Sequence, residues 1–157
     1  MRVSLLHILA VAGAITATIA PSHASAARCS LPGISGSWGY TYSGTIFTPA
    51  GPVPAASVGR FSEDASGNVT GSQTRSVAGV SGVEDISGSV TVNRDCSATA
   101  TVDVSVNGQV TRTAVLALVY DNNQNQARGI FQSLTLANGT NVPVVITIDF
   151  ARVFPKD

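Results

Sequence analysis

Apolar and polar side chains alternate with a period of two along most of the chain, from residue 36 to residue 153. Such alternation is typical of strands that bury one face, and no segment of this stretch has the spacing of a helix. Clusters of Gly, Asn, Asp and Pro, which favour turns, interrupt the alternation seven times. The pattern predicts eight strands, at about residues 36–47, 55–63, 68–77, 83–92, 98–106, 109–120, 126–136 and 142–153.

The predicted connections between these strands are all short. Consecutive strands joined by short turns pair in antiparallel fashion, and closing the sheet on itself removes its exposed edges. A two-sheet sandwich is the alternative, but sandwiches normally contain long crossover connections, which this sequence lacks. We therefore expect an all-β fold, an eight-stranded antiparallel up-and-down (meander) barrel.

The turn at Asn107-Gly108 fixes one register within the predicted sheet. Both residues tolerate positive φ, so the pair favours a two-residue type I′ hairpin. Counting outward from this turn places Asp103 opposite Arg112, on a face that also carries large aliphatic side chains. Two interpretations stay open: an ordinary cross-strand ion pair at the surface, or a polar spot inside the barrel that contacts a ligand.

The last predicted strand has one clearly apolar face. Val144, Ile146, Ile148 and Phe150 share that face, and we expect them to point into the core. Arg152 continues the same face at the end of the strand. Its guanidinium is expected either to reach solvent or to close one end of the barrel.

The N-terminus predicts export. One charge at Arg2 is followed by a short apolar run over 5–20, and the small residues at 24–26 fit a signal-peptidase site. We expect a signal peptide over 1–26, cleavage after Ala26, and a single secreted or periplasmic domain over 27–157.

The residues behind this cleavage site exclude several functions. Residues 27–157 hold eight Lys and Arg, since Arg2 is removed from the nine, against nine Asp and Glu, with no basic cluster. Nucleic acid is therefore not an expected partner, and no apolar run is long enough for membrane insertion. Both histidines, His7 and His23, precede residue 27, which excludes Ser-His-Asp and Cys-His catalysis. No metal or cofactor is expected, and a protein partner is not identified by the sequence.

Cys29 and Cys96 are the only two cysteines. In an exported chain such a pair predicts a disulfide. Closing a loop of this length stabilises the fold by about 4 kcal/mol in the chain-entropy account.

The start of the first strand resembles a known family of barrels. Gly36-x-Trp38 is similar to the opening motif of the calycins, which include the lipocalins and avidins. The resemblance implies that Trp38 fills one end of the barrel and that a basic residue of the last strand lies against it. Arg152 could occupy that place, so Trp38 and Arg152 are expected to form a barrel-end lid.

Two further stretches, 29–31 and 67–72, look like parts of the avidin pattern. Avidins place a biotin-contacting tyrosine soon after the second stretch, whereas this chain has Gln73 there. Trp38 is its only tryptophan, so biotin binding is not expected. The overall pattern also resembles small exported bacterial proteins and the allene oxide cyclase type of barrel, whose activity would need a shaped pocket rather than a fixed motif.

Large aromatic side chains and one arginine are the candidate ligand-binding residues. An eight-stranded barrel either fills with its own side chains or holds one small ligand. Two interpretations stay open for these side chains, as core or as pocket lining. The candidates are Tyr40, Tyr42, Phe61, Arg112, Phe131 and Phe150.

The residues present are compatible with three functions. The first is binding of a small apolar or amphipathic molecule in the interior. The second is a filled barrel that acts as a surface interaction or structural module. The third is a barrel cyclase or isomerase that uses a tyrosine, Arg112, Glu63 or Glu84 for acid-base chemistry, although no catalytic motif favours an enzyme. Asn68 and Asn138 begin sequons that a eukaryotic secretory pathway could glycosylate.

Overall fold

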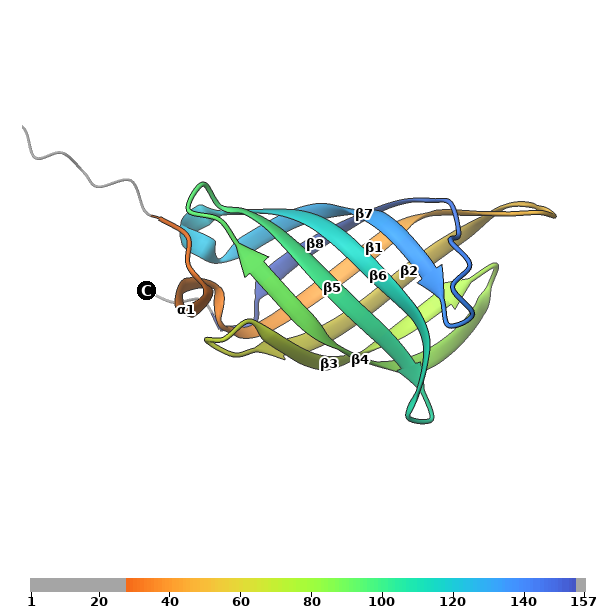
Figure 1. The fold of residues 1–157 in the computed structure, drawn as a ribbon, viewed down its shortest axis with the longest axis horizontal. Helices are drawn as coiled ribbons and strands as arrows, with labels where there is room; N and C mark the ends of the chain where they lie inside the picture. The colour runs from red at the N-terminus through yellow and green to blue at the C-terminus, as the bar shows by residue number, and fades with distance from the viewer. Residues whose placement is uncertain (1–27, 155–157) are drawn as a thin grey trace, which may run out of the picture.

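The protein forms a closed antiparallel barrel in which each strand pairs with the next and β8 pairs with β1 (Figure 1). The structure is a computed structural model that describes residues 28–154, so the predicted signal peptide lies outside the described residues. The predicted eight-stranded meander is confirmed, and the sandwich alternative is wrong. The strands are β1 Gly36–Thr48, β2 Gly51–Glu63, β3 Asn68–Val77, β4 Val80–Val92, β5 Ser97–Val106, β6 Gln109–Asp121, β7 Gln126–Leu136 and β8 Val144–Arg152.

The hairpin between β1 and β2 is tighter than the sequence predicts. A break over 49–54 was expected, but β2 begins at Gly51 and includes two prolines. Pro52 lies opposite Phe47, whose N–H donates to the carbonyl of Pro143 at 2.9 Å instead of to β2. The pair is therefore not hydrogen-bonded across the hairpin, and the missing N–H of the proline costs nothing there.

Two short helices are present where no helix was expected. Helix α1 spans Leu31–Ile34, and a 3-10 turn, η1, spans Asn122–Gln124. The hydroxyl of Ser30 caps α1 by accepting a hydrogen bond from the N–H of Gly33 at 3.2 Å. One turn is too short to produce a helical spacing in the sequence, which is why periodicity missed it. Among residues 28–154, no helix is long and apolar enough to cross a membrane.

A β-bulge corrects the predicted pairing of β5 with β6. Ser105 lies opposite Val110, but Val104 lies opposite Arg112, so Thr111 is an extra residue in β6. The predicted pair of Asp103 with Arg112 is therefore wrong, because one inserted residue moves every later partner by one. Asp103 instead accepts a hydrogen bond from the Thr113 hydroxyl at 2.5 Å, whereas Arg112 is buried and points into the barrel.

The barrel is apolar inside, as the alternation predicts. On β8, Ile146, Ile148 and Phe150 are buried while the residues between them are exposed. The strands run between two different ends. Helix α1 lies across one, which we call the α1 end; the other, formed by the turns at 49–50, 78–79 and 107–108 and by the connection 137–143, we call the far end (Figure 1).

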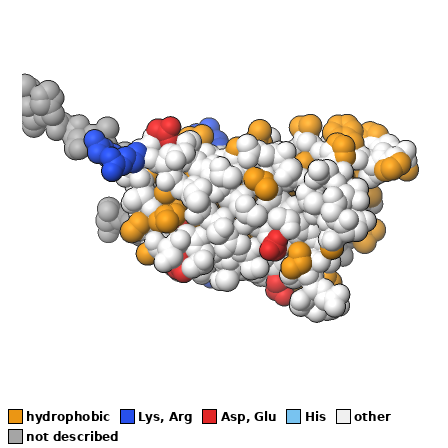
Figure 2. Space-filling model, in the orientation of Figure 1, with side chains coloured by type: hydrophobic (Ala, Val, Ile, Leu, Met, Phe, Trp, Pro, Cys, Tyr) orange, Lys and Arg blue, Asp and Glu red, His pale blue; other side chains and the backbone are white. Residues whose placement is uncertain are grey.

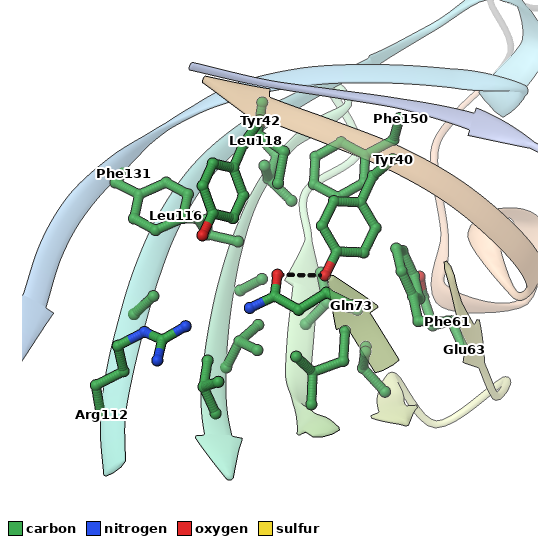
Figure 3. Close-up of a pocket in the computed structure, with 18 of the residues that line it drawn as sticks. Tyr40, Tyr42, Phe61, Glu63, Gln73, Arg112, Leu116, Leu118, Phe131 and Phe150 are labelled. Atoms are coloured by element: carbon green, nitrogen blue, oxygen red, sulfur yellow. Dashed lines mark hydrogen bonds between the residues drawn. The ribbon is translucent and has the colours of Figure 1, made fainter. Parts of the chain in front are cut away.

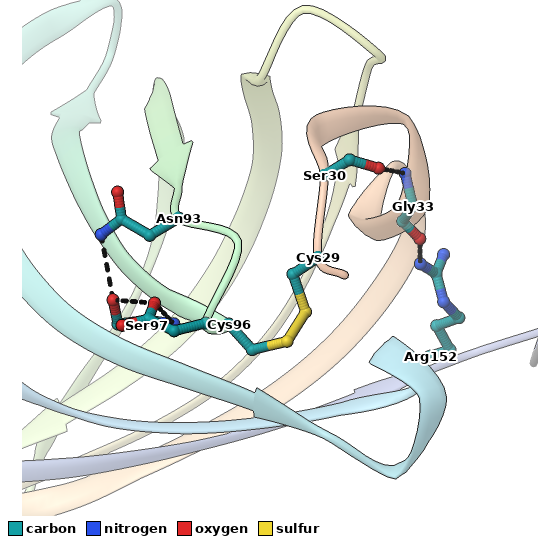
Figure 4. The surroundings of a disulfide bond; sticks show 8 residues. Cys29, Ser30, Gly33, Asn93, Cys96, Ser97 and Arg152 are labelled. Atoms are coloured by element: carbon teal, nitrogen blue, oxygen red, sulfur yellow. Dashed lines mark hydrogen bonds between the residues drawn. A yellow bond between two sulfur atoms is a disulfide. The ribbon is translucent and has the colours of Figure 1, made fainter. Parts of the chain in front are cut away.

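The predicted disulfide is present and anchors the chain at the α1 end. It joins Cys29, just before α1, to Cys96 in the turn between β4 and β5, with 5.0 Å between the two Cα atoms (Figure 4). The bond holds the segment that leads into β1 against the opposite side of the barrel.

Trp38 and Arg152 lie against each other at the α1 end, as the sequence resemblance implies. The Trp38 side chain is 1% exposed, and its indole N–H donates to the carbonyl of Ile34 at 2.9 Å. The Arg152 guanidinium lies 4.6 Å from the centre of the indole ring. It also donates hydrogen bonds to three backbone carbonyls, those of Gly33, Ser35 and Gln124.

Gly36 makes this arrangement possible. Its φ is +140°, and a Cβ atom at this position would lie 2.5 Å from the Arg152 Nη1 atom. The first residue of the Gly36-x-Trp38 motif is thus a glycine because the arginine occupies the space that a side chain would need.

Replacing both cysteines by serine is predicted to lower the free energy of unfolding by about 4 kcal/mol, because the unfolded chain regains the freedom of a long loop. Urea unfolding of the C29S/C96S variant, compared with the oxidised and the reduced wild type, measures this. The reduced wild type should match the variant. An unchanged unfolding midpoint in both would show that the disulfide does not stabilise the barrel.

Candidate binding site inside the barrel

A cavity of about 60 Å³ lies within the barrel, surrounded mostly by apolar side chains (Figure 3). It runs from Glu63 and Tyr120 at the α1 end toward Arg112 and Phe131 on the far-end side. The structure places every sequence-predicted ligand-binding residue in the lining of this one cavity: Tyr40, Tyr42, Phe61, Arg112, Phe131 and Phe150. Trp38 and Arg152 are not part of it and lie at the α1 end.

The aromatic rings form two groups around the cavity. Tyr40, Phe61 and Phe150 pack against one another, with ring centres 5.8–5.9 Å apart. Tyr42 and Phe131 meet edge to face, with ring centres 5.4 Å apart, nearer the far end. The distances are those of ordinary aromatic packing, so these rings serve as core and cavity wall at once.

The Tyr40 ring is held in place by a glycine and a glutamine. It lies over Gly59, where a Cβ atom would approach the ring within 2.6 Å. Its hydroxyl donates to the Gln73 Oε1 atom at 2.9 Å (Figure 3). A phenol is thus fixed inside the barrel with its hydrogen bond satisfied.

Buried charges form the polar part of the barrel interior. Glu84, 4% exposed, accepts hydrogen bonds from both terminal nitrogens of Arg112, with Nη1 to Oε1 at 2.8 Å. Arg75 Nε donates to Oε1 at 3.0 Å, and Gln73 Nε2 donates to Oε2 at 2.8 Å. Each carboxylate oxygen of Glu84 therefore accepts two hydrogen bonds, three of the four from arginine.

Gln73 joins this charged group to the tyrosines. Its Oε1 atom accepts from the hydroxyls of Tyr40 and Ser57, while its amide nitrogen donates to Glu84. We call Ser57, Gln73, Arg75, Glu84 and Arg112 the polar cluster. Because each of these side chains is hydrogen-bonded to another member of the cluster, burying them inside the barrel is tolerated.

The electrostatics keep Glu84 ionised and the tyrosines neutral. Burial opposes ionisation of Glu84, but the hydrogen bonds and charge of Arg112, with help from Gln73 and Arg75, hold its pKa below the usual value. Burial raises the pKa of Tyr40 and of Tyr42. Burial also raises the pKa of Tyr120, and the nearby charge of Glu63 adds to that rise.

Glu84 is poorly suited to act as a general base. A general base needs a free lone pair and a pKa near the working pH, whereas the Glu84 carboxylate is ionised and saturated with hydrogen bonds. Residues 28–154 also contain no group of three or more His, Cys, Asp or Glu side chains placed to hold a metal ion. What the cavity offers is a mostly apolar surface with guanidinium, amide and phenol groups toward Arg112, and with Glu63 and Tyr120 at the α1 end.

Sequence reasoning missed the pairing that builds the polar cluster. Gln73 was noticed only as a departure from the avidin pattern, and Glu84 only as a possible base. Alternation along β4 could have placed Glu84 inside, because it shares a face with Ile86 and Val90. Its pairing with Arg112 across the barrel has no sequence signal, since β4 and β6 are not neighbours.

Phe131 lies where the barrel wall is least regular. Leu116 pairs with Phe131 but Val115 pairs with Ser133, so Gln132 is the extra residue of a bulge. The ladder between β7 and β8 covers only Gln126–Ile130, and β7 beyond that point pairs with the connection at Asn141 instead of with β8 itself. A side chain of the cavity wall thus lies beside a gap in strand pairing.

Comparison of the chain with protein-family models, with curated proteins and with solved structures finds no match. The class of protein is therefore defined by the fold and the site alone. It is an eight-stranded antiparallel closed β-barrel with one disulfide, a covered α1 end and a small, mostly apolar interior cavity.

Glu84→Gln is predicted to lower the free energy of unfolding by about 3–5 kcal/mol near neutral pH, because the buried Arg112 and the partly exposed Arg75 lose their counter-charge. Since the folded-state pKa of Glu84 is lowered, its contribution is present above the unfolded pKa of about 4.3 and is lost as pH falls through the folded value. The difference between wild type and E84Q should therefore shrink below about pH 4.

Urea unfolding of both proteins across this pH range measures the difference. Asp85→Asn is the matched control, because Asp85 is the exposed neighbour on the outer face of β4. A wild-type advantage that stays constant from neutral to acid pH would contradict the assigned ion pair.

Proposed function

We propose that the barrel binds a small apolar or amphipathic molecule in its interior. The observation that carries this proposal is the cavity itself, a mostly apolar space with polar side chains in two places. Gln73, Arg112 and the hydroxyls of Tyr40 and Tyr42 form one group, and Glu63 and Tyr120 line the α1 end. Small-molecule sites typically combine a mostly apolar lining with a few placed polar groups that orient the ligand.

The size of the cavity limits the molecule. About 60 Å³ is roughly the share of two water molecules in the liquid, and typical ligand pockets measure about 300–1,000 Å³. The ligand is therefore small, or it displaces wall side chains on entry. Phe131 is the side chain best placed to move, since it stands at a bulge beside the gap between β7 and β8.

The broader setting of the proposal is an exported, calycin-like barrel. A closed meander with a tryptophan and an arginine packed together at one end supports the calycin likeness. The disulfide is compatible with an oxidising compartment, as secretion or transfer to the periplasm requires.

Mass spectrometry under native and denaturing conditions tests the proposal on protein purified gently from the cells or medium that produce it. We expect extra mass that disappears on denaturation. Ala100→Leu, which adds bulk to the cavity wall, should reduce the bound fraction severalfold, because the added atoms occupy the ligand's space. Ala56→Leu is the matched control, since Ala56 is exposed on β2. Bare polypeptide in every spectrum would count against interior binding.

A second candidate function is contact through the far end. Segments 43–59, 76–83, 104–111 and 133–148 contain no Asp, Glu, Lys or Arg. Large apolar side chains are exposed there, and hydrophobic atoms gather toward this end in Figure 2. Exposed apolar side chains grouped in this way favour an interaction surface. They are Phe47, Val80, Val83, Val106, Val110 and Leu136.

Sedimentation velocity over a range of protein concentrations tests this second candidate in its simplest form, contact between two copies. We expect two copies to associate through the far end. The V80T/V83T variant should weaken this association severalfold, because both positions lose apolar contact area. Val119→Thr, at an exposed valine of β6 near the α1 end, should leave association unchanged. A single monomeric species throughout would contradict this use of the far end.

A further inference from the structure

We infer that the interior ligand carries one negative charge and that its anionic group binds beside Arg112. This inference rests on the proposed function and names the chemical class of the ligand: a small carboxylate, or a related monoanion, with a short apolar part.

Arg112 has hydrogen-bonding capacity left inside the barrel. A guanidinium has five N–H donors, and among the described residues those of Arg112 engage only the two oxygens of Glu84. The side chain lines the cavity and is 9% exposed. Three N–H groups therefore have no partner among the described residues, and an anionic oxygen is their best acceptor.

The charges of the polar cluster do not cancel. One carboxylate, that of Glu84, accepts hydrogen bonds from two guanidinium groups, Arg112 and Arg75. Asp85 of β4 and Asp103 of β5 lie on the outer face, and Glu63 lines the same cavity at its α1 end, away from Arg112. The cluster thus carries one net positive charge, and a bound monoanion would neutralise it.

The surroundings of Arg112 fit a molecule with an anionic head and an apolar tail. Figure 3 shows the Tyr42 hydroxyl and the Arg112 guanidinium on the same side of the cavity, with Phe131 and Leu116 beside them. An oxygen of the ligand could accept from both polar groups at once. The wall between this place and the polar α1 end at Glu63 and Tyr120 is mostly apolar and would contact the tail.

Titration of the disulfide-intact protein with butanoate, hexanoate and their neutral amides, butanamide and hexanamide, followed by nuclear magnetic resonance, tests the charge directly. Each acid and amide share one carbon skeleton, so the tail contact is constant. We expect the acids to bind about tenfold more tightly than the amides, because charge-assisted hydrogen bonds are the stronger ones.

Three variants distinguish ligand recognition by Arg112 from a merely structural role of the polar cluster, because the two roles predict different changes in affinity for the acids. Arg112→Met should abolish the preference for the acids, whereas Glu84→Gln should raise their affinity severalfold by removing the competing carboxylate. Arg60→Met, on the exposed outer face of β2, is the matched control and should keep the wild-type preference. If R112M does not fold, Arg75→Met leaves the Glu84–Arg112 pair intact and should still reduce the preference.

The outcomes separate this inference from the proposed function. Equal binding of acids and amides by the wild type would overturn the monoanion and leave interior binding standing. Loss of affinity in E84Q as in R112M would also overturn it, since the cluster would then act only as a support. Binding of neither series, together with a bare polypeptide in native mass spectra, would remove both proposals.

Discussion

The width of a closed eight-stranded barrel is the constraint on which the rest of this structure depends. The strands fix an interior that is about as wide as the side chains that point into it. Every second residue must therefore either fill that space or leave a defined cavity. The packing of Tyr40 over Gly59 shows how closely size is matched, because even one added carbon would meet the ring.

The same constraint explains why the buried polar residues form a connected group. A charge within such an interior is strongly destabilising unless other groups pair with it. Glu84 meets this condition by accepting hydrogen bonds from Arg112, Arg75 and Gln73. Gln73 in turn accepts a hydrogen bond from the Tyr40 hydroxyl. The arrangement leaves unused guanidinium donors at the cavity, so the group that stabilises the wall is also the group that could recognise a ligand.

The two ends of the barrel differ in physical character. At the α1 end the disulfide, Trp38 and Arg152 hold a short helix across the opening. At the far end the connections are uncharged and expose apolar side chains. The gap in pairing between β7 and β8 begins on the far-end side, so access to the cavity is expected there and not through the α1 end.

Much of the fold followed from residue patterns, and the exceptions have physical causes. Alternation predicted the eight strands, their order and the inward face of β8, because burial of one face imposes a period of two. The bulge at Thr111 escaped prediction, since one inserted residue leaves no mark in composition. Because of this bulge, Asp103 lies on the outer face of the barrel, whereas Arg112 points into it.

The candidate site was predictable only in part, for a related reason. Its aromatic residues are few and large, so the core had to include them, and all six named residues line the cavity. The contact between Glu84 and Arg112 crosses the barrel between strands that are not neighbours, and it depends on tilt and stagger that a linear pattern does not contain.

The central claim is that a ligand binds inside the barrel and not on its far-end surface. Intermolecular nuclear Overhauser effects between hexanoate methylene and methyl protons and the protein test it most directly. The account predicts contacts to the ring protons of Phe131 and Phe150 and to the methyl groups of Leu116, all in the cavity lining. Contacts confined to the exposed methyl groups of Val80, Val83 and Val106 would contradict it.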